Sequence, residues 1–143
     1  MTAVPALSDD AVAWVVKHLD NAVRLSRDES EEAATNFRVV FDVRPPVRAS
    51  VIEMANCITH RGRAGRRRWN ELRRSTESEE VLVVYLKACV GWRGVLRLGD
   101  DEALAAQSPV ARYPDDLVVV GPQFEWAFVS NEHVGEALLQ PRW

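Results

Sequence analysis

The sequence has almost no lysine. Only Lys17 and Lys87 are lysines among its 18 basic residues, and the other sixteen are arginines. A GC-rich genome explains such a bias without any role for function. Arginine nevertheless has a planar guanidinium group that binds carboxylates and phosphates through two hydrogen bonds at once. The place where the arginines gather therefore matters for function.

Cysteine and long apolar segments are scarce as well. Cys57 and Cys89 are the two cysteines, and two thiols in a cytosolic chain are most often free, although the sequence leaves their pairing open. No apolar run approaches the roughly 18 residues that a membrane span needs. The first residues lack the basic and apolar regions of a signal peptide. We therefore expect a cytoplasmic protein that binds no membrane.

The composition is typical of an ordinary globular domain. The chain has 143 residues, of which 47% are hydrophobic and 27% are charged, and its formal net charge is −3. That length is enough for one domain with a sizeable core, and the composition excludes a wholly disordered chain. No repeat or low-complexity tract divides the chain, so we expect a single domain over residues 1–143.

Hydrophobic periodicity predicts both helices and strands. Ser50 and Glu53 have the spacing of a helix capping box, and residues 27–32 are expected to form a charged loop or a frayed continuation of the first helix. Hairpin-like spacings in the second half favour an α+β fold with a mostly antiparallel sheet of about five strands and helices on one face, in an order that stays open. The predicted helices cover 9–25, 50 to about 61, 66–74 and 101–107, and the predicted strands cover 37–43, 81–88, 92–98, 117–120 and 124–128.

The most unusual local feature is the basic segment from Arg61 to Arg74. It holds seven of the 18 basic residues and one acid, Glu71, so it carries a formal charge of +6 and the rest of the chain carries −9. Clustered guanidinium groups beside an indole suit phosphate contact and base stacking. The alternative is a solvated helix whose arginines pair with the protein's own carboxylates. The candidates for phosphate or nucleic-acid binding are Arg61, Arg63, Arg66, Arg67, Arg68, Trp69, Arg73 and Arg74.

Part of this segment, Arg61-Gly62-Arg63-Ala64-Gly65-Arg66, resembles the arginine- and glycine-rich loop with which acetyltransferases hold the pyrophosphate of coenzyme A. Such a loop binds phosphate through backbone N–H groups at a helix N-terminus. It follows a strand, whereas the helix predicted from Ser50 precedes it in this sequence. We therefore expect no coenzyme, and no other motif implies a cofactor.

Metal binding and catalysis have weaker support. Glu53, Cys57 and His60 have helical spacing and could converge on a metal, with Cys89 or His133 as a further ligand. A small core cysteine and a helix-end histidine explain the same residues, so we expect no metal site. An enzyme with an unrecognised small pocket is a further alternative, and its candidate residues are His60, Glu132 and His133.

The C-terminal stretch from Asp116 to His133 predicts a strand, a turn at 121–123, an aromatic-x-Trp strand and then a histidine. This order resembles the ending of small bacterial immunity-like proteins, some of which pair with toxins. The resemblance implies a binding protein of α+β fold and assigns no catalytic residue. The other interpretation is the core face of a hairpin, made of Phe124, Trp126 and Phe128.

The charge distribution and this resemblance together predict a non-enzymatic interaction protein of the immunity or inhibitor type. A predominantly acidic surface could cover a basic site on a partner protein, such as a toxin, through electrostatic complementarity. Nucleic-acid or phosphate binding through the basic segment is the alternative function. The oligomeric state stays open. The candidate contacts with a basic partner are Asp100, Asp101, Glu102, Asp115 and Asp116.

Overall fold

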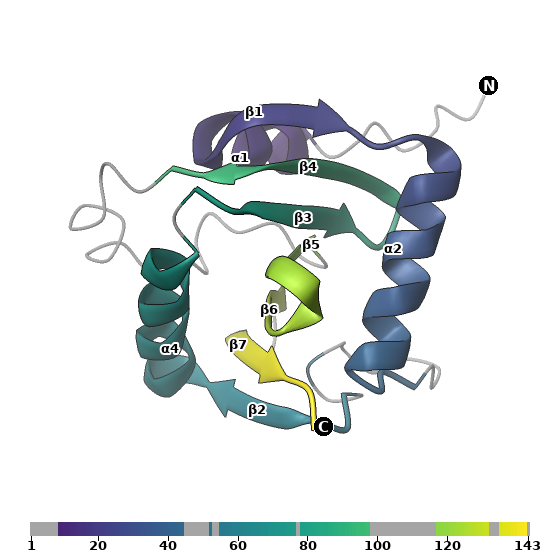
Figure 1. Cartoon of the computed structure of the whole chain (residues 1–143). Helices are drawn as coiled ribbons and strands as arrows, with labels where there is room; N and C mark the ends of the chain where they lie inside the picture. Colours follow the sequence, from purple (N-terminus) through teal and green to yellow (C-terminus); the bar gives the residue numbers. More distant parts are fainter. Residues whose placement is uncertain are drawn as a thin grey trace.

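The computed structural model describes residues 9–44, 52, 55–76, 78–97, 117–131 and 135–142. Figure 1 shows how the elements in these ranges are arranged. In chain order they are α1 (Asp9–His18), β1 (Leu19–Arg24), α2 (Arg27–Val40), β2 (Ile58–Arg61), α4 (Gly62–Ser75), β3 (Glu80–Tyr85), β4 (Val90–Leu96), β5 (Leu117–Val120), the 3-10 helix η2 (Pro122–Phe124), β6 (Ala127–Asn131) and β7 (Gly135–Gln140).

The described strands form one seven-stranded sheet in the order β1-β4-β3-β5-β6-β7-β2. Every neighbouring pair is antiparallel. The α+β fold with an antiparallel sheet is confirmed, but the sheet has seven strands and not about five. Strands β1 and β2 lie where the sequence predicts helices, and both are edge strands whose pairing depends on a single neighbour.

One face of the sheet is covered by α1 and α4. The strand register places Trp92, Val83, Val119, Phe128 and Leu138 in one row across five strands. All five side chains are buried in one cluster with apolar residues of the two helices. Because side chains alternate between the two faces of a strand, this row fixes which residues face α4.

The opposite face is covered by α2. The neighbouring row of the sheet, which includes Val118, Val129 and Ala137, is buried in a cluster with Phe37 and Phe41. Figure 1 shows α4 and α2 on opposite sides of the strands. The prediction of helices on one face only is therefore wrong. A sheet covered on both faces also explains why β5 is buried at all four positions.

The segment predicted as a strand over 37–43 is mostly the end of α2. Phe37 and Phe41 are fully buried, with ring centroids 5.3 Å apart, because residues four apart lie on the same side of a helix. Val39 is 73% exposed, although an alternating strand pattern would have placed it on the same face as the two phenylalanines. The prediction of a strand was wrong because the apolar residues of this segment fit both the alternation of a strand and the 3.6-residue period of a helix.

Residues 27–32, predicted as a charged loop or a frayed continuation of the first helix, are the start of a separate helix, α2. Glu29 N donates a hydrogen bond to Ser26 Oγ at 3.1 Å, and Ser26 N donates to Glu29 Oε1 at 3.0 Å. These two bonds form a capping box, which satisfies backbone N–H groups that have no partner within the helix. The charges therefore belong to a helix N-terminus and not to a loop.

The helix predicted over 9–25 ends at His18. The following residues pair with β4, with Leu19 opposite Leu96, and Asn21 takes a φ of 56° where the register shifts. Leu19 and Val23 are four residues apart, so they continue the apolar stripe of α1 in the sequence although they belong to a strand. This coincidence of spacing hides β1 from a periodicity argument.

The second half of the sheet follows the sequence more closely. The hairpin of β3 and β4 is confirmed, with its turn over 86–89, and β5 is confirmed over 117–120. β6 begins at Ala127, so Phe124 and Trp126 precede the strand that was expected to contain them. The helix predicted over 101–107 lies outside the described residues. None of the described helices is long and apolar enough to cross a membrane.

Candidate anion-binding face on helix α4

The basic segment begins where an edge strand turns into a helix. β2 pairs with β7 alone, and a hydrogen bond of 2.9 Å joins His60 Nε2 to Gln140 Oε1. Gly62, the first residue of α4, has a φ of +60°, which glycine adopts without strain. The helix predicted from Ser50 does not extend to Arg61, because residues 58–61 form β2, and the predicted capping residues Ser50 and Glu53 lie outside the described residues. The order of strand, glycine and helix N-terminus is one in which backbone N–H groups can meet a phosphate.

Gly65 allows α4 to approach the sheet closely. A Cβ at this position would lie 2.3 Å from the backbone oxygen of His60 and 3.3 Å from the backbone nitrogen of Leu138. The helix therefore rests directly on the backbones of β2 and β7. Gly62 begins α4 and Gly65 lies inside it, so neither glycine interrupts this helix.

Trp69 is a core residue. It is 7% exposed, its ring stacks on Phe128 at a centroid distance of 4.5 Å, and it meets Trp126 edge-on at 5.4 Å. An indole in this position has no free face for a nucleic-acid base. The prediction that Trp69 offers a stacking platform beside the arginines is therefore wrong.

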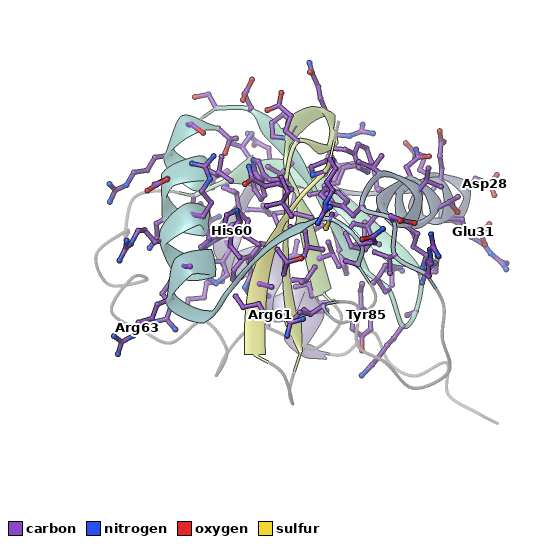
Figure 2. All side chains as sticks on the ribbon, turned by 90° about the horizontal axis from the view of Figure 1, so that it is seen from below. Asp28, Glu31, His60, Arg61, Arg63 and Tyr85 are labelled. Carbon is purple, nitrogen blue, oxygen red and sulfur yellow. The ribbon has the colours of Figure 1, made fainter. Side chains whose placement is uncertain are left out.

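The arginines of α4 extend from its outer face. Positions 63, 67 and 74 lie on one side of a helix with 3.6 residues per turn, roughly opposite Trp69. Arg63, Arg67 and Arg74 are all exposed, as is Arg61 at the end of β2. Figure 2 shows Arg63 pointing away from the body of the molecule. We call Arg61, Arg63, Arg67 and Arg74 the basic face.

Pairing within the protein accounts for only part of the segment. Arg68 Nη1 lies 3.0 Å from Glu71 Oε2, and Arg66 and Arg74 each take part in a further interaction. Nothing is described of the Arg73 side chain. Within the described ranges no ion pair involves Arg61, Arg63 or Arg67. The alternative in which the arginines pair with the protein's own carboxylates therefore holds for Arg68, but it does not account for Arg61, Arg63 and Arg67.

The two 14-residue helices, α2 and α4, have opposite charges at their N-termini. In α2, the hydrogen bonds that Glu29 makes with Ser26, and then the nearby Arg93 guanidinium, hold the pKa of Glu29 below its usual value, and Asp28 adds a second acid. In α4, Arg61 is the N-cap without a side-chain hydrogen bond, and the first turn has no acidic residue. Since helix N-termini carry partial positive charge, α4 adds positive charge where α2 neutralises it.

The acids of α2 lie far from the basic face. Figure 2 shows Asp28 and Glu31 at the opposite side of the molecule from Arg63. The acids at the start of α2 and the arginines of the basic face therefore lie on different sides of the described part of the chain. The residues predicted to contact a basic partner lie outside the described residues, and so do two of the candidate catalytic residues; they are Asp100, Asp101, Glu102, Asp115, Asp116, Glu132 and His133.

A cleft of about 190 Å³ opens between α2 and the face of the sheet that α2 covers. Its described lining includes no histidine, and His60 lies on the other face of the sheet, in the row of Leu138. Sequence periodicity missed the cleft because its main wall, α2, was predicted as loop and strand. The Ser26 to Glu29 spacing was the signal that could have found this wall. The lining residues are Leu25, Glu29, Glu32, Ala33, Asn36, Leu82, Arg93 and Phe124.

The cysteines do not form a metal site with the described residues. Cys57 and Cys89 are free thiols, as expected, and burial raises the pKa of the Cys57 thiol. The helical spacing predicted for Cys57 and His60 is wrong, because Cys57 precedes β2 and His60 lies within that strand. Among the described residues, no group of three His, Cys, Asp or Glu side chains could hold a metal ion.

Comparison with known proteins adds no relative. No family model, no curated protein and no solved structure matches this chain. The function must therefore be argued from the charges and the contacts of the described residues.

Proposed function

We propose that this chain is a non-enzymatic binding protein whose basic face contacts the phosphates of double-stranded nucleic acid. The observation that carries the proposal is the N-terminus of α4, which has neither a side-chain cap nor an acidic residue in its first turn. Anions bind at such helix ends through backbone N–H groups and the helix dipole. Arginine adds bidentate, charge-assisted hydrogen bonds to phosphate oxygens.

Folding alone favours different residues at this end of α4. A charge of the wrong sign in the first helical turn costs about 0.3–1 kcal/mol at low ionic strength, and a missing N-cap side chain costs about 1 kcal/mol. Arg61 and Arg63 stand where serine, aspartate or glutamate would stabilise the helix, as they do in α2. A bound phosphate supplies the missing negative charge, so anion binding gives a reason for residues that helix stability does not explain.

The spacing of the arginines suits a duplex. Arg63 and Arg67 are about 6 Å apart along the helix axis, and Arg74 is about 10 Å further on. Duplex DNA carries one charge per 1.7 Å or so of its axis, so this row faces several phosphates. Proteins that bind single strands add exposed aromatic rings for base stacking, whereas Trp69 is packed against Phe128. We therefore favour the duplex over the single strand.

The acidic balance of the whole chain does not oppose this binding. The net charge is −3, but the acidic start of α2 and the basic face of α4 lie on opposite sides of the sheet. Two helix layers separated by a sheet are about 20 Å apart, and the Debye length at physiological ionic strength is about 8 Å. A polyanion at α4 is therefore largely screened from the acids of α2.

Salt-dependent binding tests the proposal. A fluorescently labelled duplex of about 20 base pairs is titrated with the protein at several salt concentrations, and anisotropy gives the affinity. If Arg61, Arg63 and Arg67 each contact one phosphate, log K falls against log salt with a slope of about −2.7, which is roughly fortyfold weaker binding at 200 mM than at 50 mM salt. A single strand of the same length is expected to bind more weakly. An affinity that does not change with salt would exclude phosphate contacts.

A second candidate function is binding of a basic partner protein: the resemblance to immunity-like proteins implies a binding protein, and the acidic charge balance outside the basic segment favours a basic partner. The observation favouring it is the cleft beside α2, whose lining includes Glu29 and Glu32. The acids at 100–102 and 115–116 lie outside the described residues and stay a prediction. Electrostatic complementarity would steer such a partner to the acidic side. The product of a neighbouring toxin gene is then expected to co-purify with this chain and to dissociate in high salt.

A further inference from the structure

The cleft between α2 and the sheet combines an apolar floor with a charged rim. Leu25 and Ala33 are buried, and Leu82 of β3 is half-buried beside them. Glu29 and Glu32 line the cleft from α2. Its volume of about 190 Å³ is smaller than the roughly 300–1,000 Å³ typical of sites for drug-sized ligands. The cleft therefore suits a single side chain better than a whole small molecule.

Two polar groups of the lining have no partner among the described residues. Glu32 and Asn36 are four residues apart on α2, so they lie on the same side of the helix. In the part of the chain that the structure describes, neither side chain takes part in a hydrogen bond or an ion pair. Glu29, by contrast, accepts a hydrogen bond from Ser26 N and lies 3.7 Å from Arg93 Nη2. A carboxylate and an amide oxygen are thus available to an incoming donor.

Phe124 lines the same cleft from the turn after β5. Its φ is 58° and that of Gln123 is 56°, a left-handed conformation that bulky residues rarely adopt. A hydrogen bond of 3.1 Å from Phe124 N to Gly121 O holds the turn. Residues in such conformations cluster at sites that bind ligands. This turn brings Phe124 to a cleft whose lining also includes the carboxylate of Glu32.

We propose that this cleft binds a lysine side chain of a basic partner protein. The aliphatic stem of lysine matches the apolar floor, its ammonium group donates to Glu32 and Asn36, and a cation near the Phe124 ring gains further attraction. The lining holds two carboxylates and one guanidinium, so one ammonium group makes it neutral. The inference rests on the second candidate function and is independent of α4, which lies on the opposite side of the sheet.

Titration of isotope-labelled protein with Nα-acetyl-lysine N-methylamide tests the inference through backbone amide chemical shifts. Saturable shifts are expected along α2, near Leu82 in β3 and in the turn of Phe124. The norleucine analogue has nearly the same stem without the charge, and it is expected to cause no such shifts. Absence of shifts with the lysine analogue, or equal shifts with both, would overturn the proposal.

A pair of variants on α2 separates local contact from general attraction. Glu32→Gln keeps the shape of the side chain and is expected to weaken binding of the lysine analogue about tenfold. Glu31→Gln removes the same charge from the next position and is expected to leave binding unchanged. Glu31 pairs with Arg27 at 3.3 Å and lies on the outer side of α2 (Figure 2). Equal weakening by both variants would contradict a site in the cleft.

Two further measurements test the charge argument and distinguish a lysine side chain from a free polyamine. Arg93→Gln removes the cation that already neutralises Glu29, so it is expected to strengthen binding of the lysine analogue about threefold; weaker binding would contradict the charge argument. Spermidine binding more tightly than the lysine analogue would overturn the protein partner in favour of a free polyamine. Failure of these titrations with salt-dependent duplex binding intact would remove this inference and leave the α4 proposal standing.

Discussion

Replacing Trp69 with alanine is expected to lower the free energy of unfolding by about 3–5 kcal/mol. The indole is 7% exposed and packs against the rings of Trp126 and Phe128. These contacts join α4 to the start of β6, so their loss leaves a cavity between the helix and the sheet. Chemical denaturation followed by circular dichroism measures the loss.

Trp69→Phe separates the packing of this residue from any role in binding. It keeps an aromatic ring next to Phe128, so the free energy of unfolding is expected to fall by only about 1–2 kcal/mol. Duplex affinity is expected to equal that of the wild type, since the ring is buried. Unchanged stability together with binding about tenfold weaker would contradict the buried position and restore base stacking as the role of Trp69.

Removing two guanidinium groups from the basic face is expected to weaken duplex binding about thirtyfold at low salt. In Arg63→Gln/Arg67→Gln each position loses a charge-assisted contact to phosphate, and two contacts worth about 1 kcal/mol each give this factor. The slope of log K against log salt is expected to become less steep by about 1.8. Anisotropy titration at 50 and 200 mM salt measures both changes.

Arg24→Gln/Arg38→Gln is the matched control for this variant. It removes the same total charge from two exposed arginines on β1 and α2, away from α4. Its duplex affinity is expected to stay within about twofold of the wild type, because charges beyond a Debye length are screened. An equal loss of affinity in both double variants would mean that net charge, and not the basic face, controls binding.

The second half of the sheet could be predicted because its sequence fits one structure only. Residues 117–120 are an apolar run next to turn residues, which is typical of a strand covered on both faces, and all four are buried. The run at 81–88 forms β3 as far as Tyr85, with Val81, Val83 and Val84 buried, and its last three residues lie in the turn that follows. In a continuous apolar run, periodicity does not distinguish a helix from a strand, and the short length of the run then favours a strand.

The first half could not be predicted in this way because two periods fit the same residues. Phe37 and Phe41 are compatible with alternation and with helical spacing, and only their packing against the sheet decides between the two. The helix is nevertheless marked in the sequence, because Ser26 and Glu29 have the spacing of a capping box. These two residues precede Phe37 and Phe41 in the sequence, next to and within the segment 27–32 that was not predicted to start a helix.

The sequence shows that basic residues gather between Arg61 and Arg74, but it does not show how their side chains are arranged in space. The sequence puts Trp69 among the arginines, whereas the helix turns it toward the core and away from Arg63 and Arg67. The predicted helix begins at Arg66, but α4 begins at Gly62. This shift of four residues places Arg61 at the N-cap of α4 and moves Arg63 from a loop into its first turn. The uncapped N-terminus on which the proposed function depends is therefore a property of the structure.

The free energy of unfolding of Arg63→Glu tests the central claim most directly. If the N-terminus of α4 lacks compensating negative charge, a glutamate in the first turn is expected to raise the free energy of unfolding by about 0.5–1 kcal/mol at low ionic strength. The same variant is expected to bind the duplex more weakly than the wild type, so stability and affinity change in opposite directions. A variant less stable than the wild type would mean that this positive end is already compensated within the protein, which contradicts the claim.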